Sequence, residues 1–219
     1  MSGGYPVQLL RGALVTLEVA AAAACLGLAL GLLGGLASTA RSGAIRVPVR
    51  AATAVLRGVP EFVILLVSFF ALSGALWRLT GGAVTVSPLL AGAAALGLTF
   101  GAYASEAFRG AFASVPGGQE EAAIALGLGR ADRMRHVLLP QALRLAVPSL
   151  GNQWQSLLKD TSLVSVIGLG DLMRRADAAG QATEQPFTFL LAAAALYWLL
   201  LAATAPLQRA IEQIGRAHV

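Results

Sequence analysis

The chain has 219 residues, of which 57% are hydrophobic and 12% are charged, and its mean hydropathy is +0.72. A soluble domain carries roughly 25% charged residues, so this composition excludes an ordinary water-soluble globule and predicts a membrane protein. The net charge of +5 comes from 15 arginines and one lysine that are dispersed along the chain, a pattern that argues against nucleic-acid binding and favours contact with anionic membrane lipid.

Gaps between charged residues predict about five membrane-spanning helices in chain order. A helix needs about 20 mostly apolar residues to cross the ~30 Å hydrocarbon layer. The predicted spans lie in the ranges 12–40, 62–77, 79–105, a fourth region after 144 that a polar stretch interrupts, and 185–208. The predicted fold class is therefore an all-α membrane protein, with one transmembrane domain over residues 1–219.

Glycines recur every four residues in the first predicted span, at Gly27, Gly31 and Gly35. Residues at this spacing share one helix face and let the backbone of a second helix approach closely. The pattern predicts tight helix packing, although a chain with 25 glycines can also produce it by chance.

The distribution of basic residues predicts the orientation of the spans. Eleven of the 16 lysines and arginines fall in the loops on one side and five on the other. The more basic side stays in the cytoplasm. We therefore expect the amino terminus outside and the carboxyl terminus inside.

A long polar loop over residues 114–146 lies on the predicted cytoplasmic side. Good helix formers follow Gln119, and Gly127 is placed to end that helix. A second short helix is expected from about Ala131, closing before Pro140. Loops that only connect two helices are far shorter. This loop is therefore predicted to form a rigid projection, called the knob, that another protein binds.

This loop carries the motif Glu121-Ala122-Ala123, three residues, Gly127, nine residues, and then Val137-Leu138-Leu139-Pro140. The pattern resembles the signature loop of ATP-binding-cassette (ABC) importer permeases. The likeness extends along nearly the whole chain, for example through Arg57-Gly58-Val59-Pro60-Glu61 and Lys159-Asp160-Thr161-Ser162. It points to the polar amino acid branch, especially permeases for histidine, arginine, lysine and ornithine.

The resemblance implies a type I importer permease fold in the bacterial cytoplasmic (inner) membrane, moving solute by alternating access. It implies as partners two ATP-binding cassette subunits, a second permease subunit, identical or different, an external solute-binding protein and an amino acid. ATP and magnesium would bind those partner ATPases. The positions that match the family's coupling loop are Glu121, Ala122, Ala123, Gly127, Leu139 and Pro140.

The residues themselves predict neither an ATPase nor another enzyme. The only lysine, Lys159, has Asp160 where a phosphate-binding P-loop has Ser or Thr. A single cysteine, Cys25, and two histidines, His136 and His218, provide no material for a disulfide, a metal site or a convergent catalytic centre. We therefore expect no cofactor on this chain.

Polar residues within the spans are the candidates for a substrate pathway, because charges at membrane depth are costly. Glu18 and Glu61 could form a negative cavity for cationic amino acids, or they could lie at an interface, paired with an arginine such as Arg57. Lys159 and Asp160 could line the pore or lie at a helix end. The full candidate set is Glu18, Glu61, Asn152, Gln153, Lys159, Asp160, Thr161 and Ser162.

Two further functions remain open from the residues. The same architecture could carry amino acids of the glutamine or glutamate type, or the helices could form a passive channel or structural bundle. On the predicted outer side, the mixed charges of the loop 168–185 suit contact with a solute-binding protein, or they are simply solvated.

Overall fold

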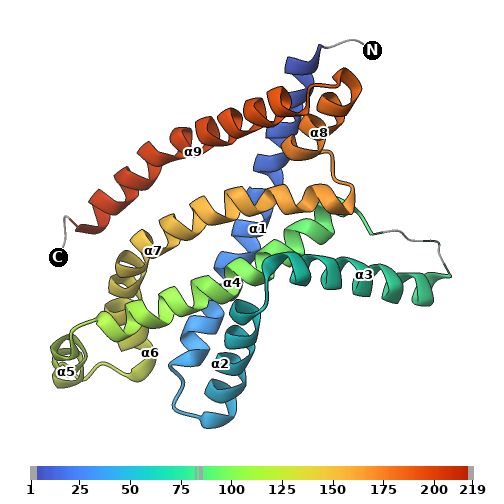
Figure 1. Cartoon of the computed structure of the whole chain (residues 1–219). Helices are drawn as coiled ribbons and strands as arrows, with labels where there is room; N and C mark the ends of the chain where they lie inside the picture. Colours follow the sequence, from blue (N-terminus) through green and yellow to red (C-terminus); the bar gives the residue numbers. More distant parts are fainter. Residues whose placement is uncertain (1–3, 82, 84–85, 217–219) are drawn as a thin grey trace.

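The computed structural model of the chain describes residues 4–81, 83 and 86–216, and in that part it consists of helices and turns without a β-strand (Figure 1). The elements in chain order are α1 (Tyr5–Ser38), α2 (Gly43–Gly58), α3 (Glu61–Thr80), α4 (Pro88–Ser114), α5 (Gly117–Ala125), α6 (Arg130–Asp132), the π-helix η1 (Arg133–Leu138), α7 (Leu139–Asp160), the 3-10 helix η2 (Thr161–Ile167), α8 (Leu172–Thr183) and α9 (Pro186–Arg216).

Among the described residues, α1, α3, α4 and α9 are long and apolar enough to cross a membrane. They coincide with the first, second, third and fifth predicted spans. The fourth predicted region forms α7, whose 22 residues measure about 33 Å at 1.5 Å per residue. Its composition is too polar for the same classification, but the helix is continuous up to Asp160, where the backbone tightens into η2.

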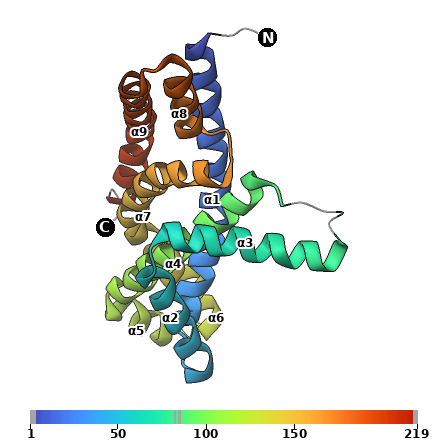
Figure 2. The same ribbon diagram turned by 45° about the vertical axis from the view of Figure 1, so that its right-hand side comes forward.

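The main core lies where α4 packs along α1 and where α7 covers α4 (Figures 1 and 2). Gly31 is buried in α1, and a Cβ atom placed on it would lie 2.5 Å from the Cβ of Ala104 in α4. A Cβ on Gly27 would lie 2.5 Å from a ring carbon of Phe100. The prediction that the glycine face of α1 receives another helix is therefore confirmed, and α4 is that helix.

We expect Gly31→Ala to lower the thermal unfolding midpoint of the purified protein, because overpacking costs about 1–3 kcal/mol. The matched control is Gly74→Ala in α3, where an added Cβ meets nothing within 4 Å. Alanine there should be neutral or stabilising, since glycine weakens a helix interior by about 0.5–1 kcal/mol relative to alanine. An equal fall in both variants would contradict the packing argument.

Two helices are only partly covered by the rest of the chain. The start of α3 packs into the core through the fully buried Leu65, whereas the helix then projects away from the others (Figures 1 and 2) and Phe70 on it is largely exposed. α2 has no buried residue and lies between the first two predicted spans. Arg50 holds α2 against the end of α1 by donating from Nη2 to the carbonyl oxygen of Ser38, at 2.9 Å.

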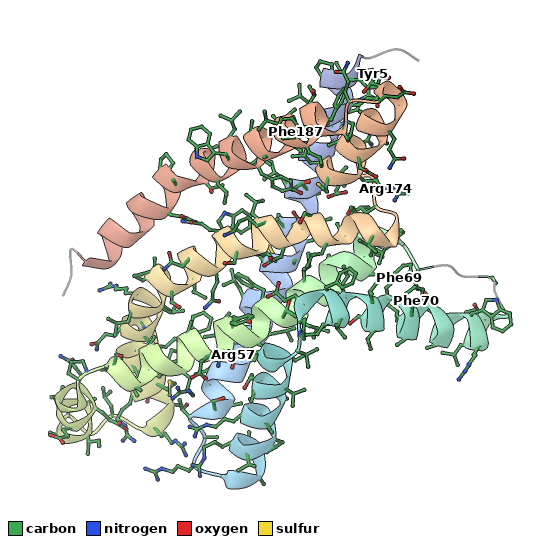
Figure 3. All side chains as sticks on the ribbon, in the orientation of Figure 1. Tyr5, Arg57, Phe69, Phe70, Arg174 and Phe187 are labelled. Atoms are coloured by element: carbon green, nitrogen blue, oxygen red, sulfur yellow. The ribbon has the colours of Figure 1, made fainter. Side chains whose placement is uncertain are left out.

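A second, smaller core joins α1, α8 and α9 at the end of the molecule that lies opposite α5 (Figure 1). Asp171 is fully buried and its carboxylate accepts the backbone N–H groups of Met173 and Arg174, capping α8. The next residue, Leu172, donates its N–H to Thr16 Oγ1 of α1 at 3.2 Å. Asp171 is thus a structural cap, whereas Arg174 in the same segment is exposed (Figure 3).

Candidate functional site

A cavity of about 400 Å³ opens between α3, α4 and α7. Each helix contributes from the face that it turns toward the others: the first residue of α3, three residues of α4 and four residues of α7. The lining residues are Glu61, Thr99, Phe100, Tyr103, Gln153, Ser156, Leu157 and Asp160.

Two carboxyl groups dominate the electrostatics of this cavity. Glu61 begins α3 and Asp160 ends α7, and both side chains line the cavity. Neither lysine nor arginine is present among the lining residues that the structure describes. Because Coulomb attraction strengthens where water is scarce, such a cavity favours a cation.

The amide of Gln153 adds an unused hydrogen-bond acceptor to the two carboxyl groups. Its Nε2 donates to the carbonyl oxygen of Tyr103 and to Ser149 Oγ, each at 3.3 Å. Its Oε1 is buried and accepts no hydrogen bond from the described part of the chain. A buried acceptor without a donor is costly, so the cavity suits a ligand that brings N–H groups.

A network of charged and aromatic side chains adjoins the cavity at Tyr103. The guanidinium carbon of Arg57, at the end of α2, lies 5.5 Å from the centre of the Tyr103 ring, which is a cation–π distance. Arg57 Nη1 is also 3.9 Å from Glu106, which in turn pairs with Arg109 one turn further along α4. These contacts tie α2 to α4, as Figure 3 shows for Arg57.

The structure brings together three of the eight predicted pathway residues in this cavity, namely Glu61, Gln153 and Asp160. Glu18 and Asn152 are exposed elsewhere and do not line it. Lys159 and Ser162 face a separate cavity against α9. Thr161 is buried, and its hydroxyl donates to the carbonyl oxygen of Leu158 at 2.7 Å.

Sequence reasoning missed three polar lining residues: Thr99, Tyr103 and Ser156. Thr99 and Tyr103 are four residues apart on α4 and therefore share one helix face. That pair of polar side chains within an otherwise apolar span was a signal that could have found the face.

The second part of the site is α5 and the turn that follows it, which correspond to the predicted knob. Gly127 has a φ of +77° and donates its N–H to the carbonyl oxygen of Ile124, while Leu128 donates to Ala123. These two bonds form a Schellman motif, in which glycine takes the left-handed position after the helix. The predicted helix end at Gly127 is therefore confirmed.

One side of α5 is buried against the chain and the other is exposed. Ala123 is buried against the chain, whereas Glu121 and Ala122 are exposed. The apolar side chains of Ile124 and Leu126 are 53% and 80% exposed.

The expected helix from about Ala131 is confirmed, since α6 begins at Arg130, and Pro140 lies in the first turn of α7 as expected. The expected break before Pro140 was wrong, because α6, η1 and α7 follow one another continuously. Pro140 has no N–H to donate, and Leu139 before it donates to the carbonyl oxygen of Met134, so the ladder widens to i→i−5 bonds and continues. These three elements form one continuous helical segment over residues 130–160, which we call the rod. It joins the turn after α5 to Gln153 and Asp160 in the cavity.

Comparison with known proteins gives concordant matches. The family described as "Binding-protein-dependent transport system inner membrane component" matches residues 27–214. The histidine/lysine/arginine/ornithine transport system permease protein HisQ of Escherichia coli (strain K12) is 38% identical over 198 residues, which cover 89% of this chain and 87% of the relative. The nopaline transport system permease protein NocQ of Agrobacterium fabrum is 42% identical over 204 residues, covering 90% and 86%.

Among solved structures, the chain is similar to one described as "Crystal structure of an amino acid ABC transporter with histidines". The two superpose with a TM-score of 0.84 at 30% identity, over 97% of this chain and 99% of the other. The match extends over α1 to α9 and so includes both the cavity and the α5 knob.

Proposed function

Because the chain belongs to the family of binding-protein-dependent transport system inner membrane components, we propose that it is the permease subunit of an ATP-driven importer of polar amino acids, with basic amino acids as its preferred substrates. The names of its relatives support this class: HisQ is described as a transporter of histidine, lysine, arginine and ornithine, and NocQ of nopaline.

The observation that carries the proposal is the acceptor-rich cavity between α3, α4 and α7. A basic amino acid brings an α-ammonium group and a cationic side chain, and both donate hydrogen bonds. Glu61, Asp160 and the free Oε1 of Gln153 accept them. A glutamate-type solute would place a second carboxylate beside two existing ones, which like-charge repulsion disfavours.

The proposed mechanism uses α5 as the coupling helix on the cytoplasmic side of the bacterial inner membrane. Two partner ATPase subunits hydrolyse ATP. Their surfaces bind α5 through Glu121, Ala122 and Ala123. The turn at Gly127 passes their movement to α6, η1 and α7, and Leu139 and Pro140 begin that last helix. Displacement of α7 moves Gln153 and Asp160, so the cavity faces each side of the membrane in turn.

Three kinds of partner subunit complete the importer in this proposal. A second permease subunit covers exposed apolar helix faces such as that of α3. An external solute-binding protein delivers the amino acid at the α8 end, where Arg174 is exposed. The two ATPases supply ATP and magnesium, and this chain binds no cofactor of its own.

The test is uptake by the complex reconstituted in proteoliposomes with its ATPase and binding protein. We expect ATP-dependent uptake of labelled arginine and histidine that exceeds uptake of labelled glutamine. Uptake at the same rate without the ATPase would indicate a passive channel and refute the mechanism. A preference for glutamine or glutamate would refute the basic substrate class but leave the permease assignment intact.

A further inference from the structure

A second cavity of about 400 Å³ lies at the α5 end of the bundle, away from the cavity described above. The segments around it are the turn between α1 and α2, the middle of α2, the end of α4, the start of α5, and α6 with η1. Five of its lining residues are arginines and one is acidic: Arg41, Arg50, Arg109, Arg130, Arg133 and Glu120.

The charges in this arginine cavity are not balanced within the chain. Arg109 pairs with Glu106, and Arg133 Nη2 lies 3.8 Å from Glu120. Arg41 and Arg130 make no side-chain hydrogen bond or ion pair with the part of the chain that the structure describes. Among the described residues, two carboxylates stand against these five guanidinium groups, and one of the two, Glu106, is shared with Arg57 outside the cavity.

Arg133 gives a second, independent sign of a missing anion. Its side chain is mostly buried, and its Nε is buried without a hydrogen-bond acceptor in the described part of the chain. Leaving a buried donor unpaired is costly. Nearby, the Arg50 side chain donates a hydrogen bond to the carbonyl oxygen of Ser38, which provides a partial and not a full negative charge.

The chemistry of the cavity matches a phosphate group. Guanidinium groups present paired N–H donors that fit two oxygens of a phosphate at once. Phe112, Met134 and Leu138 supply an apolar wall beside the arginines, as an acyl-linked headgroup requires. The site also lies beside the ends of α1 and α4, at Ser38 and Ser114. Both helices are long and apolar enough to cross a membrane, and lipid headgroups lie beyond the hydrocarbon layer that such helices cross.

We propose that the arginine cavity binds a phosphate-bearing anion, and that in the membrane this is the headgroup of an anionic phospholipid of the cytoplasmic leaflet. The assignment of the leaflet rests on the proposed function. The bound phosphate bridges the α1–α2 turn, through Arg41, to the rod after the coupling helix, through Arg130 and Arg133. It therefore holds the coupling helix in register with the helices that enclose the substrate cavity.

The experiment measures lipid retention by the intact transporter complex in nanodiscs, using phosphatidylcholine alone or mixed with phosphatidylglycerol, followed by native mass spectrometry. We expect phosphatidylglycerol to remain bound to the wild-type complex. The double variant Arg41→Gln/Arg130→Gln should retain at least about fivefold less. The matched control, Arg135→Gln/Arg144→Gln, removes two exposed arginines that do not line the cavity and should retain it as the wild type does.

A competition arm separates the two sources of phosphate. If millimolar inorganic phosphate leaves the bound phosphatidylglycerol in place, the ligand is the lipid headgroup; if it displaces the lipid, the site takes free phosphate, and the phosphate site itself stands. Equal lipid retention by the wild type, the double variant and the control would overturn the proposal. Because retention is measured without transport, a failure here is distinct from failure of amino acid uptake in proteoliposomes.

Discussion

The double variant Glu61→Gln/Asp160→Asn should reduce uptake of arginine at subsaturating concentration by about 10- to 100-fold, while uptake of glutamine falls much less. A hydrogen bond to a charged group contributes about 1.5–3 kcal/mol, and each 1.4 kcal/mol is a factor of ten in affinity. Both carboxyl groups line the same cavity, and the amides retain their shape while removing the charge. The measurement is the ratio of labelled arginine to labelled glutamine taken up by the reconstituted complex.

The matched control is Asp177→Asn in α8. This carboxylate is exposed and bonds to Gln181 on the surface, so its neutralisation should leave the ratio unchanged. Each single variant, Glu61→Gln and Asp160→Asn, should shift the ratio in the same direction as the double variant. If the double variant keeps the wild-type preference for arginine over glutamine, the two carboxyl groups do not select the substrate.

The spans were predictable where their sequence is locally apolar. α1, α3, α4 and α9 coincide with uninterrupted gaps between charges, because the bilayer imposes one length and one composition on every exposed span. α7 escapes this rule because it carries polar residues, of which Gln153 and Asp160 line a cavity, where the cost of polar groups is met by neighbours. α2 was missed although Arg46, Arg50 and Arg57 stand at helical spacing beside apolar residues, which is the signal of an amphipathic helix.

The sequence predicts those features of the site that depend on residues close together in the chain, and it does not predict those that depend on how the helices pack. The glycine at the end of α5 follows from the sequence, since few other residues accept a φ of +77°. The meeting of Glu61 with Asp160 does not, because it depends on how α3 and α7 pack against α4, and nothing near either residue encodes that. The exclusion of Lys159 from the cavity has the same cause: it neighbours Asp160 in sequence but points toward α9.

The continuity of α6, η1 and α7 could not be predicted from proline alone. Pro140 signals the first turn of a helix, and that is where α7 begins. The signal does not reveal whether the preceding turn is a separate helix. Wider i→i−5 bonding at Leu139 removes the need for a break, so the helix continues from α6 through η1 into α7.

The continuity of this rod underlies the second large predicted effect. Gly127→Pro should leave the chain inserted but lower ATP-driven amino acid uptake by at least about 10-fold, while the partner ATPases continue to hydrolyse ATP. Proline fixes φ near −65°, whereas Gly127 has a φ of +77° and donates its N–H to Ile124. The turn must therefore rebuild, and α5 loses its fixed position relative to the rod that carries Asp160.

Gly117→Pro provides a matched control for this substitution. Gly117 is the first residue of α5. Proline is tolerated there because the backbone N–H at this position has no acceptor within the helix, so its loss breaks no helical hydrogen bond. Pro116 before it has a φ of −58° and a ψ of 130°, a conformation that a following proline favours. The readout is the number of amino acids taken up per ATP hydrolysed, with the control near the wild-type value. A Gly127→Pro complex with a wild-type ratio would show that movement reaches the cavity by another route, and the role of α5 as coupling helix would fall.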